Sequence, residues 1–147
     1  MSRTKVKSSV LGAEFFGTVS ALTAAATINV DFDTASTFTT TPSDNTTTFN
    51  IQNAETGMVK NIVVTGDGTA RTLAFTAEGG SGGTFNKIGT DTMDQTSGNK
   101  SIIQIVCVDD TSGSQDFWYS ISKALSYLSN NLIIPSPVDL LPAPIIV

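Results

Sequence analysis

Short runs of alternating apolar and polar residues recur along the chain from Thr27 onward, and they are rich in Val, Ile, Thr and Phe. Clusters of turn-forming residues separate these runs at intervals of about 8–12 residues, a spacing typical of β-sandwiches and barrels. The pattern predicts about eight strands, over residues 27–32, 36–41, 46–52, 58–66, 71–77, 84–89, 100–109 and 116–124. We therefore expect an all-β fold, an antiparallel β-sandwich of jelly-roll-like topology with extended N- and C-terminal arms.

The same pattern divides the chain into three parts. Residues 1–26 are predicted to be an N-terminal arm, of which 8–26 suits a short helix or an extended segment. Residues 27–124 are predicted to be the β-sandwich module, and residues 125–147 a Pro-rich extended C-terminal arm. Within the module, Asp67-Gly68 is typical of a two-residue hairpin loop. We therefore expect the runs on either side of this dipeptide to pair antiparallel.

The run 100–109 is apolar on both of its faces. Alternation places Ile103, Ile105 and Cys107 on one face, and Ile102, Val106 and Val108 on the other. A strand with this pattern is central in its sheet or is covered by a neighbouring subunit. In the last run, Trp118 points away from the face that Phe117 and Tyr119 share.

The composition limits the partners that the chain can have. At 147 residues the chain is long enough for one domain of ordinary size, and 14% of its residues are charged. A net charge of -5 argues against a nucleic-acid partner, because binding to phosphates depends on clustered Lys and Arg. No run of about 18 apolar residues occurs, so we expect no membrane-spanning helix and no membrane partner.

Few residues could support catalysis or bind a cofactor. The chain has no His, which excludes a His base, and its single Cys lies in an apolar run where desolvation disfavours the thiolate. We therefore predict no catalytic residue, no metal site and no cofactor. Three carboxylate pairs remain candidates for glycoside hydrolysis, although Asp in such positions is first of all a turn former. They are Asp31 with Asp33, Asp91 with Asp94, and Asp109 with Asp110.

The chain ends in large aliphatic residues and prolines, "NNLIIPSPVDLLPAPIIV" from Asn130 to Val147. Each aliphatic side chain contributes roughly 1.5–3 kcal/mol when it is fully buried, and prolines reduce the entropy lost on binding by stiffening the free chain. Because prolines interrupt a hydrogen-bonded ladder, the pattern favours pockets on a partner. The predicted partner-binding residues are Leu132, Ile133, Ile134, Val138, Leu140, Leu141, Ile145, Ile146 and Val147.

Several stretches of the module carry a family resemblance. They are "NTTTFNIQNAETG" (45–57), "IVVTGDGTARTLAF" (62–75), "GGTFNKIG" (82–89), "SIIQIVCVDD" (101–110) and "DFWYSISKA" (116–124). Together they resemble the small all-β module of bacteriophage virion proteins, which is found in head fibres, capsid decoration proteins and tail fibres. The resemblance implies a β-sandwich, a homotrimer and a structural role in the virion without catalysis.

These observations leave three hypotheses about function. The first and favoured one is a virion structural protein, a capsid decoration or head-fibre subunit anchored by its arms. Its partners would be its own copies and the major capsid protein or other virion proteins. The second is a receptor- or glycan-binding module of a fibre or tail, with Trp118 as the candidate ligand-binding residue, because aromatic rings stack on apolar faces. The third, a glycan-degrading enzyme, depends on the carboxylate pairs and has the weakest support.

Overall fold

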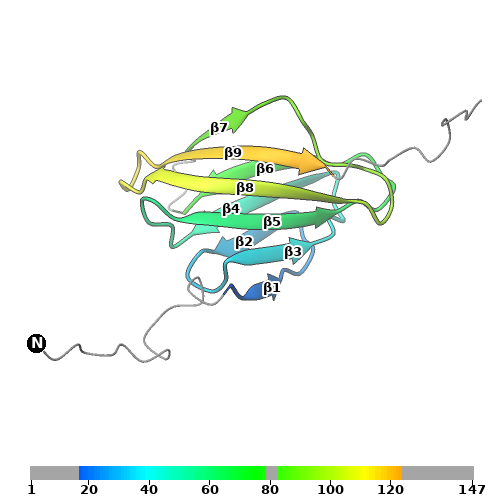
Figure 1. Cartoon of the computed structure of the whole chain (residues 1–147), viewed down its shortest axis with the longest axis horizontal. Helices are drawn as coiled ribbons and strands as arrows, with labels where there is room; N and C mark the ends of the chain where they lie inside the picture. The colour runs from blue at the N-terminus through cyan, green and yellow to red at the C-terminus, as the bar shows by residue number, and fades with distance from the viewer. Residues whose placement is uncertain (1–16, 79–82, 124–147) are drawn as a thin grey trace, which may run out of the picture.

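The structure, a computed structural model, describes residues 17–78 and 83–123, which form nine β-strands and no helix (Figure 1). The strands are β1 (Val19–Ala21), β2 (Thr27–Asp31), β3 (Thr37–Thr40), β4 (Thr46–Gln52), β5 (Val59–Thr65), β6 (Thr72–Ala77), β7 (Thr84–Ile88), β8 (Lys100–Asp109) and β9 (Asp116–Lys123). Each predicted run contains one of the strands β2 to β9. The additional strand, β1, lies within the predicted N-terminal arm, where three residues are too few to show an alternating pattern.

The strands form two sheets that face each other. The large sheet has six strands in the order β1-β3-β5-β8-β9-β7, and the small sheet has three in the order β2-β4-β6. Every pair in the small sheet is parallel, and in the large sheet only β5 with β8 and β8 with β9 are antiparallel. The all-β prediction is therefore confirmed, but the prediction of an antiparallel sandwich is wrong for most strand pairs. The jelly-roll-like topology, which is built from antiparallel strands, is not confirmed.

The parallel pairing follows from the path of the chain. From β1 to β6 each strand lies in the opposite sheet from the one before it, so the next strand in the same sheet returns in the same direction. Val19 of β1 thus lies beside Thr37 of β3, which lies beside Asn61 of β5. The antiparallel hairpin β8–β9 then fills the space between β5 and β7. As predicted for a strand that is apolar on both faces, β8 is an interior strand.

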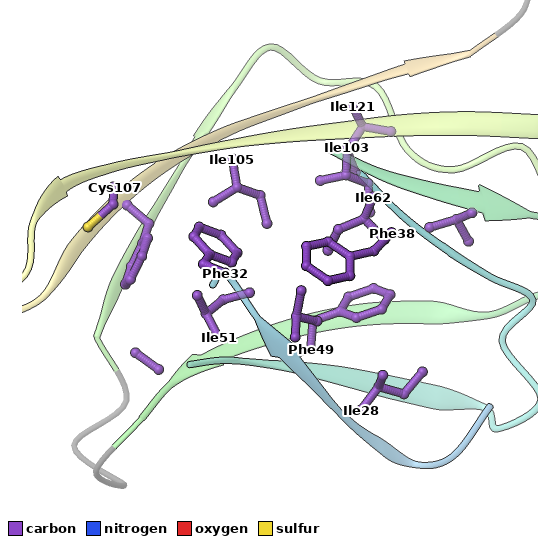
Figure 2. Packing of buried hydrophobic residues seen from close by; sticks show 14 of the residues in the cluster. Ile28, Phe32, Phe38, Phe49, Ile51, Ile62, Ile103, Ile105, Cys107 and Ile121 are labelled. Carbon is purple, nitrogen blue, oxygen red and sulfur yellow. The ribbon is translucent and has the colours of Figure 1, made fainter. Parts of the chain in front are cut away.

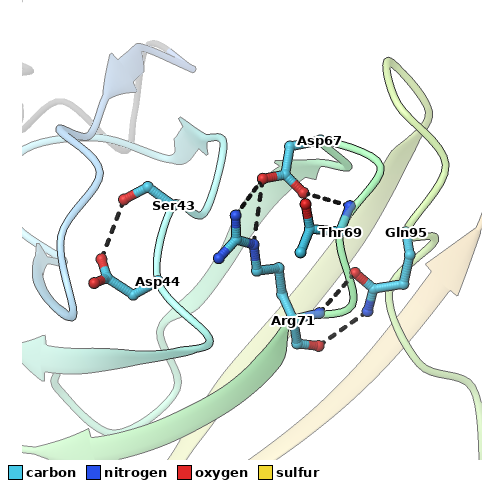
Figure 3. Close-up of polar contacts among 6 residues, drawn as sticks. All are labelled: Ser43, Asp44, Asp67, Thr69, Arg71 and Gln95. Atoms are coloured by element: carbon cyan, nitrogen blue, oxygen red, sulfur yellow. Dashed lines mark hydrogen bonds and ion pairs between the residues drawn. The ribbon is translucent and has the colours of Figure 1, made fainter.

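The predicted hairpin at Asp67-Gly68 is wrong. β5 and β6 lie in different sheets, and the turn between them carries the chain from the large sheet to the small one. A type I′ hairpin needs a positive φ at both central residues, but among the described non-glycine residues only Asn53 has one. The Asp67 carboxylate instead accepts hydrogen bonds from the N–H of Thr69 (2.9 Å) and the guanidinium of Arg71 (2.6 Å), which hold the crossing in place (Figure 3).

Large apolar side chains fill the space between the two sheets (Figure 2). The large sheet contributes Phe38, Ile62, Ile103 and Ile105, and the small sheet contributes Ile28, Phe49 and Ile51, all at most 4% exposed. Each fully buried side chain of this size contributes roughly 1.5–3 kcal/mol to stability. Because side chains alternate along a strand, the opposite face of each sheet points away from this core.

We expect substitution of Gly66, at the start of the crossing from β5 to β6, to be strongly destabilising. A Cβ at Gly66 would lie 2.5 Å from the carbonyl oxygen of Thr96 and 2.6 Å from that of Asp94. Since both contacts are backbone, we expect Gly66→Ala to lower the free energy of unfolding by roughly 3 kcal/mol. The matched variant is Gly68→Ala, whose Cβ would meet only the Ser97 Cβ at 3.7 Å but whose φ is 90°. It should cost about 1 kcal/mol. Urea denaturation measures both, and equal losses would contradict the packing argument.

Candidate functional site

The candidate site is the outer face of the large sheet, which points away from the small sheet. The register of the strands aligns its side chains in rows that cross β5, β8, β9 and β7. The rows are Val59, Val106, Trp118 and Asn86; Asn61, Gln104, Ser120 and Ile88; and Val63, Ile102 and Ser122. Two of these rows place apolar residues side by side on adjacent strands.

This outer face carries all the exposed large hydrophobic side chains of the described residues. They are Val19, Val59, Ile88, Ile102, Val108 and Trp118, between 44% and 66% exposed. We use the name outer patch for Val59, Val63, Ile102, Val106, Val108 and Trp118. The polar row of Asn61, Gln104 and Ser120 lies between Val63 and Ile102 on one side and the other four residues on the other. Clustered exposed apolar residues on one face mark an interaction site, whereas scattered ones do not.

The three rows of the outer face contain no charged residue, and the nearest carboxylates, Asp109 and Asp116, lie at the end of the face beside Val108 and Trp118. Lys100 begins β8 at one end of the face, and Asp109 ends β8 at the other. Between them, every outward residue of the three rows is aliphatic, aromatic, an amide or a hydroxyl. Depletion of charged residues with an aromatic residue present is typical of the centre of a protein–protein interface.

The outer face of the small sheet has the opposite character. Its outward residues are Thr27, Asn29, Asp31, Thr46, Thr48, Asn50, Gln52, Thr72, Ala74 and Thr76. The side-chain amide of Asn50 donates to the Asn29 side-chain oxygen at 2.9 Å, and that of Asn53 donates to the Asp31 carboxylate at 2.9 Å. Polar side chains that bond to one another between adjacent strands suit a face in contact with water. The two outer faces of the molecule therefore differ sharply in chemistry.

Trp118, the candidate ligand-binding residue, lies on β9 within the outer patch. Its side chain is 44% exposed, and its neighbours across the sheet are Val106 on β8 and Asn86 on β7. The Asn86 side-chain amide donates to the Asp116 carboxylate at 2.6 Å. Trp118 thus borders apolar residues on one side and a polar pair on the other, and its role in ligand binding stays a prediction.

Of the carboxylates that were candidates for catalysis, Asp31 ends β2, Asp109 ends β8, and Asp94 lies in the segment before β8, and each accepts a hydrogen bond from the backbone N–H two residues ahead. Asp31 accepts from the N–H of Asp33, Asp94 from that of Thr96, and Asp109 from that of Thr111. These bonds confirm the turn-forming role of Asp31, Asp94 and Asp109, one member of each pair. The N–H of Thr96 and the Asn99 side chain lower the pKa of Asp94, whereas a general acid needs a raised pKa.

Cys107 lies on the inner face of β8 and is buried, as predicted. Burial first, and then the negative charges of Asp110 and Asp109, raise the pKa of its thiol to about 11. The thiolate is therefore scarce at neutral pH. Among the described residues no group of three or more His, Cys, Asp and Glu side chains is placed to hold a metal ion.

The sequence indicated part of the outer patch and missed the rest. The alternation in 100–109 identified Ile102, Val106 and Val108 as a second apolar face. The same signal exists in β5, where Val59 and Val63 alternate with buried residues, but it became meaningful only with β5 beside β8. The predicted partner-binding residues at the C-terminus lie outside the described residues.

Comparison with known proteins does not change this description. No family model matches the chain, and neither a curated protein nor a solved structure matches it. In the part of the chain that the structure describes, no helix is long and apolar enough to cross a membrane. Function is therefore inferred from the chemistry of the two outer faces and from the sequence.

We expect the folded protein to lose stability in acid, because Asp67 has a lowered pKa in the folded state. The Arg71 side chain first, and then the N–H of Thr69, hold the pKa of Asp67 below its ordinary value of 3.8. A carboxylate with a lowered folded pKa stabilises the fold above its unfolded pKa and loses this contribution as the pH falls through the folded pKa. We expect the melting temperature to fall from about pH 5 to about pH 3, and to fall less in Asp67→Asn, which has no proton to gain. Identical pH profiles of the two proteins in thermal denaturation would rule out a contribution from Asp67.

Proposed function

We propose that this chain is a structural subunit of a bacteriophage virion, a capsid decoration or head-fibre subunit that assembles as a homotrimer through its outer patch. The observation that carries this proposal is the contrast between the two outer faces. Val106 and Trp118 lie side by side on the large sheet, while the equivalent face of the small sheet is lined with Thr, Asn and Gln. The phage assignment itself is supported by the sequence resemblance of the module.

A second copy of the chain is the partner that best suits the outer patch. Copies with a net charge of -5 repel each other, so association is favoured where no charged group has to lose its water. The six residues of the outer patch meet this condition, with Asp116 at the rim bonded to Asn86, and sheets pack face to face at about 10 Å through side chains of this size. Three copies with their large sheets directed toward a common axis would bury the outer patch of each.

The terminal segments provide further contacts in this proposal. The predicted partner-binding residues between Leu132 and Val147 are aliphatic and are separated by prolines, a composition suited to a preformed groove on another protein. The major capsid protein or another virion protein would supply this groove. The role is structural and non-catalytic, and the absence of His and the lowered pKa of Asp94 support this part of the proposal.

Binding of a receptor or glycan is the second candidate function, and the exposure of Trp118 is the observation that favours it. An exposed indole can stack on a sugar ring. The two proposed functions predict different effects of the substitution Trp118→Ala. Loss of glycan binding by a chain that remains trimeric would support the second, and dissociation of the trimer would support the first.

A matched pair of lysine substitutions tests assembly through the outer patch. Val106→Lys introduces a charge at the centre of the patch, and Thr48→Lys introduces the same charge on the outer face of the small sheet. We expect the first to convert the trimer to monomers and the second to leave the trimer intact, because only the first buries an unpaired charge. Analytical ultracentrifugation measures the mass, and circular dichroism checks that both variants are folded. A monomeric wild-type chain, or a trimeric Val106→Lys variant, would refute assembly through this face.

Purified particles test the assignment to a virion. A structural subunit is retained in many copies per particle through gradient purification, because its arms and outer patch are buried in contacts. Quantitative mass spectrometry of gradient-purified particles of the phage that encodes the chain should therefore detect it in a fixed ratio to the major capsid protein. Its presence only in the soluble fraction of the lysate would be incompatible with the proposal.

A further inference from the structure

Gln104 occupies the centre of the outer patch. On β8 it lies two residues from Ile102 and two from Val106, and all three side chains point to the outer face, because side chains alternate along a strand. Directly beside it across the sheet are Asn61 on β5 and Ser120 on β9. An exposed amide therefore stands between two aliphatic residues of its own strand.

The diagonal neighbours of Gln104 on the adjacent strands are also apolar. Val59 and Val63 lie two positions on either side of its partner on β5, and Trp118 lies two positions from its partner on β9. Residues in such diagonal positions are roughly 7–8 Å apart, within reach of aromatic and long side chains. Five of the six residues of the outer patch thus surround one amide.

Any partner that buries the outer patch must also bury this amide. In a single copy of the chain, water can bond to the Gln104 side chain, because the side chain is exposed. Removal of this water is unfavourable unless the partner offers a donor and an acceptor of its own. A purely apolar surface is therefore a poor partner for the outer patch.

Further copies of the same chain supply what the amide needs. A glutamine side chain donates through its NH2 group and accepts through its oxygen, so it is complementary to itself. Around a threefold axis, the residue nearest the axis meets its own equivalents in the other two copies. Three amides can each donate to the next, and the ring of hydrogen bonds then closes.

We infer that Gln104 lies on the threefold axis of the proposed homotrimer, and that the side-chain amides of the three copies form a closed ring of hydrogen bonds there. The inference rests on the proposed function and assigns a specific contact to the outer patch. Asn61 and Ser120, beside each amide, supply further donors and acceptors around the ring.

A ring of amides within an apolar interface determines how the copies are aligned. If one sheet slides along its strands by two residues, Gln104 faces Ile102 or Val106 of another copy, and its amide loses its partners. The apolar residues favour association in several alignments, whereas the amide favours one. A single buried polar residue fixes register and oligomeric state in coiled coils by the same physical effect.

Two substitutions of Gln104 test the ring in the full chain. Gln104→Leu removes the amide and leaves the apolar residues, so we expect a mixture of oligomers instead of the trimer alone. Gln104→Glu keeps the shape but places three carboxylates at the axis, and association at neutral pH should weaken at least about a hundredfold. Analytical ultracentrifugation measures both effects, and circular dichroism checks that the variants are folded.

The matched controls are Gln52→Leu and Gln52→Glu. Gln52 lies on the outer face of the small sheet, at the end of β4. The same two changes of side chain there should leave the trimer and its dissociation constant unchanged within about twofold, because this face takes no part in the ring.

The side-chain NH2 protons of Gln104 give a direct measurement of the ring. We expect them to exchange with solvent at least about tenfold more slowly in the wild-type trimer than in Val106→Lys, because the ring is lost with the trimer. Nuclear magnetic resonance of the chain with 15N-labelled glutamine measures this rate. The signal of Gln104 is the one that disappears in Gln104→Leu, and the signal of Gln52 should not change between the two proteins.

The outcomes separate the ring from assembly through the outer patch. A uniform trimer of Gln104→Leu, an intact trimer of Gln104→Glu, or equally fast exchange of the Gln104 side chain in wild type and Val106→Lys would overturn the ring. With a trimeric wild type and a monomeric Val106→Lys, these results would leave assembly through the outer patch standing. A monomeric wild-type chain, or a trimeric Val106→Lys variant, would overturn both proposals.

Discussion

All the described strands except β1 and β7 bury side chains of one face in the space between the two sheets, and the path of the chain depends on this constraint. From β1 to β6 the chain meets it by crossing to the opposite sheet after every strand, so that neighbours within a sheet are parallel. The crossings then need local stabilisation. The bonds between Asp67 and Arg71, and the backbone hydrogen bonds from Gly66 to Asn99 (2.8 Å) and from Gly68 to Gln95 (2.9 Å), provide it after β5.

Two parts of the surface are left able to make further contacts when these strands each bury one face. The outer patch of the large sheet exposes apolar side chains, while the edge of β6 that faces away from β4 pairs with no other strand of the described residues beyond the side-chain bonds of Gln95 to Arg71, and a hollow of about 280 Å³ lies beside β6. The two parts of the surface therefore suit different binding partners. A flat apolar face suits another sheet face, whose backbone groups are already paired, whereas an edge suits an extended segment with backbone groups to offer. The outer face of the small sheet, with its bonds between Asn29 and Asn50, has neither feature.

The carboxylates illustrate how an ordinary structural role accounts for residues that could suggest catalysis. Asp67, Asp94 and Asp109 each accept a hydrogen bond from a backbone N–H two residues ahead. The pKa of all three is lowered, first by the side chains of Arg71 for Asp67 and Thr111 for Asp109, with the backbone N–H second, and first by the backbone N–H of Thr96 for Asp94. These side chains are therefore adapted to close turns in a chain that changes direction after almost every strand.

The sequence by itself determined the strands and their faces, because alternation depends only on local geometry. The runs from β2 to β9 were predictable, as were the buried position of Cys107 and the outward position of Trp118. The tertiary structure decided which strands are neighbours. Asp67-Gly68 has the composition of a hairpin, yet β6 joins the other sheet, because its inward residues Leu73 and Phe75 complete the core beside Phe49. The outer patch could not be predicted as a whole for the same reason, since Val59 and Val106 form one surface only when β5 and β8 pair.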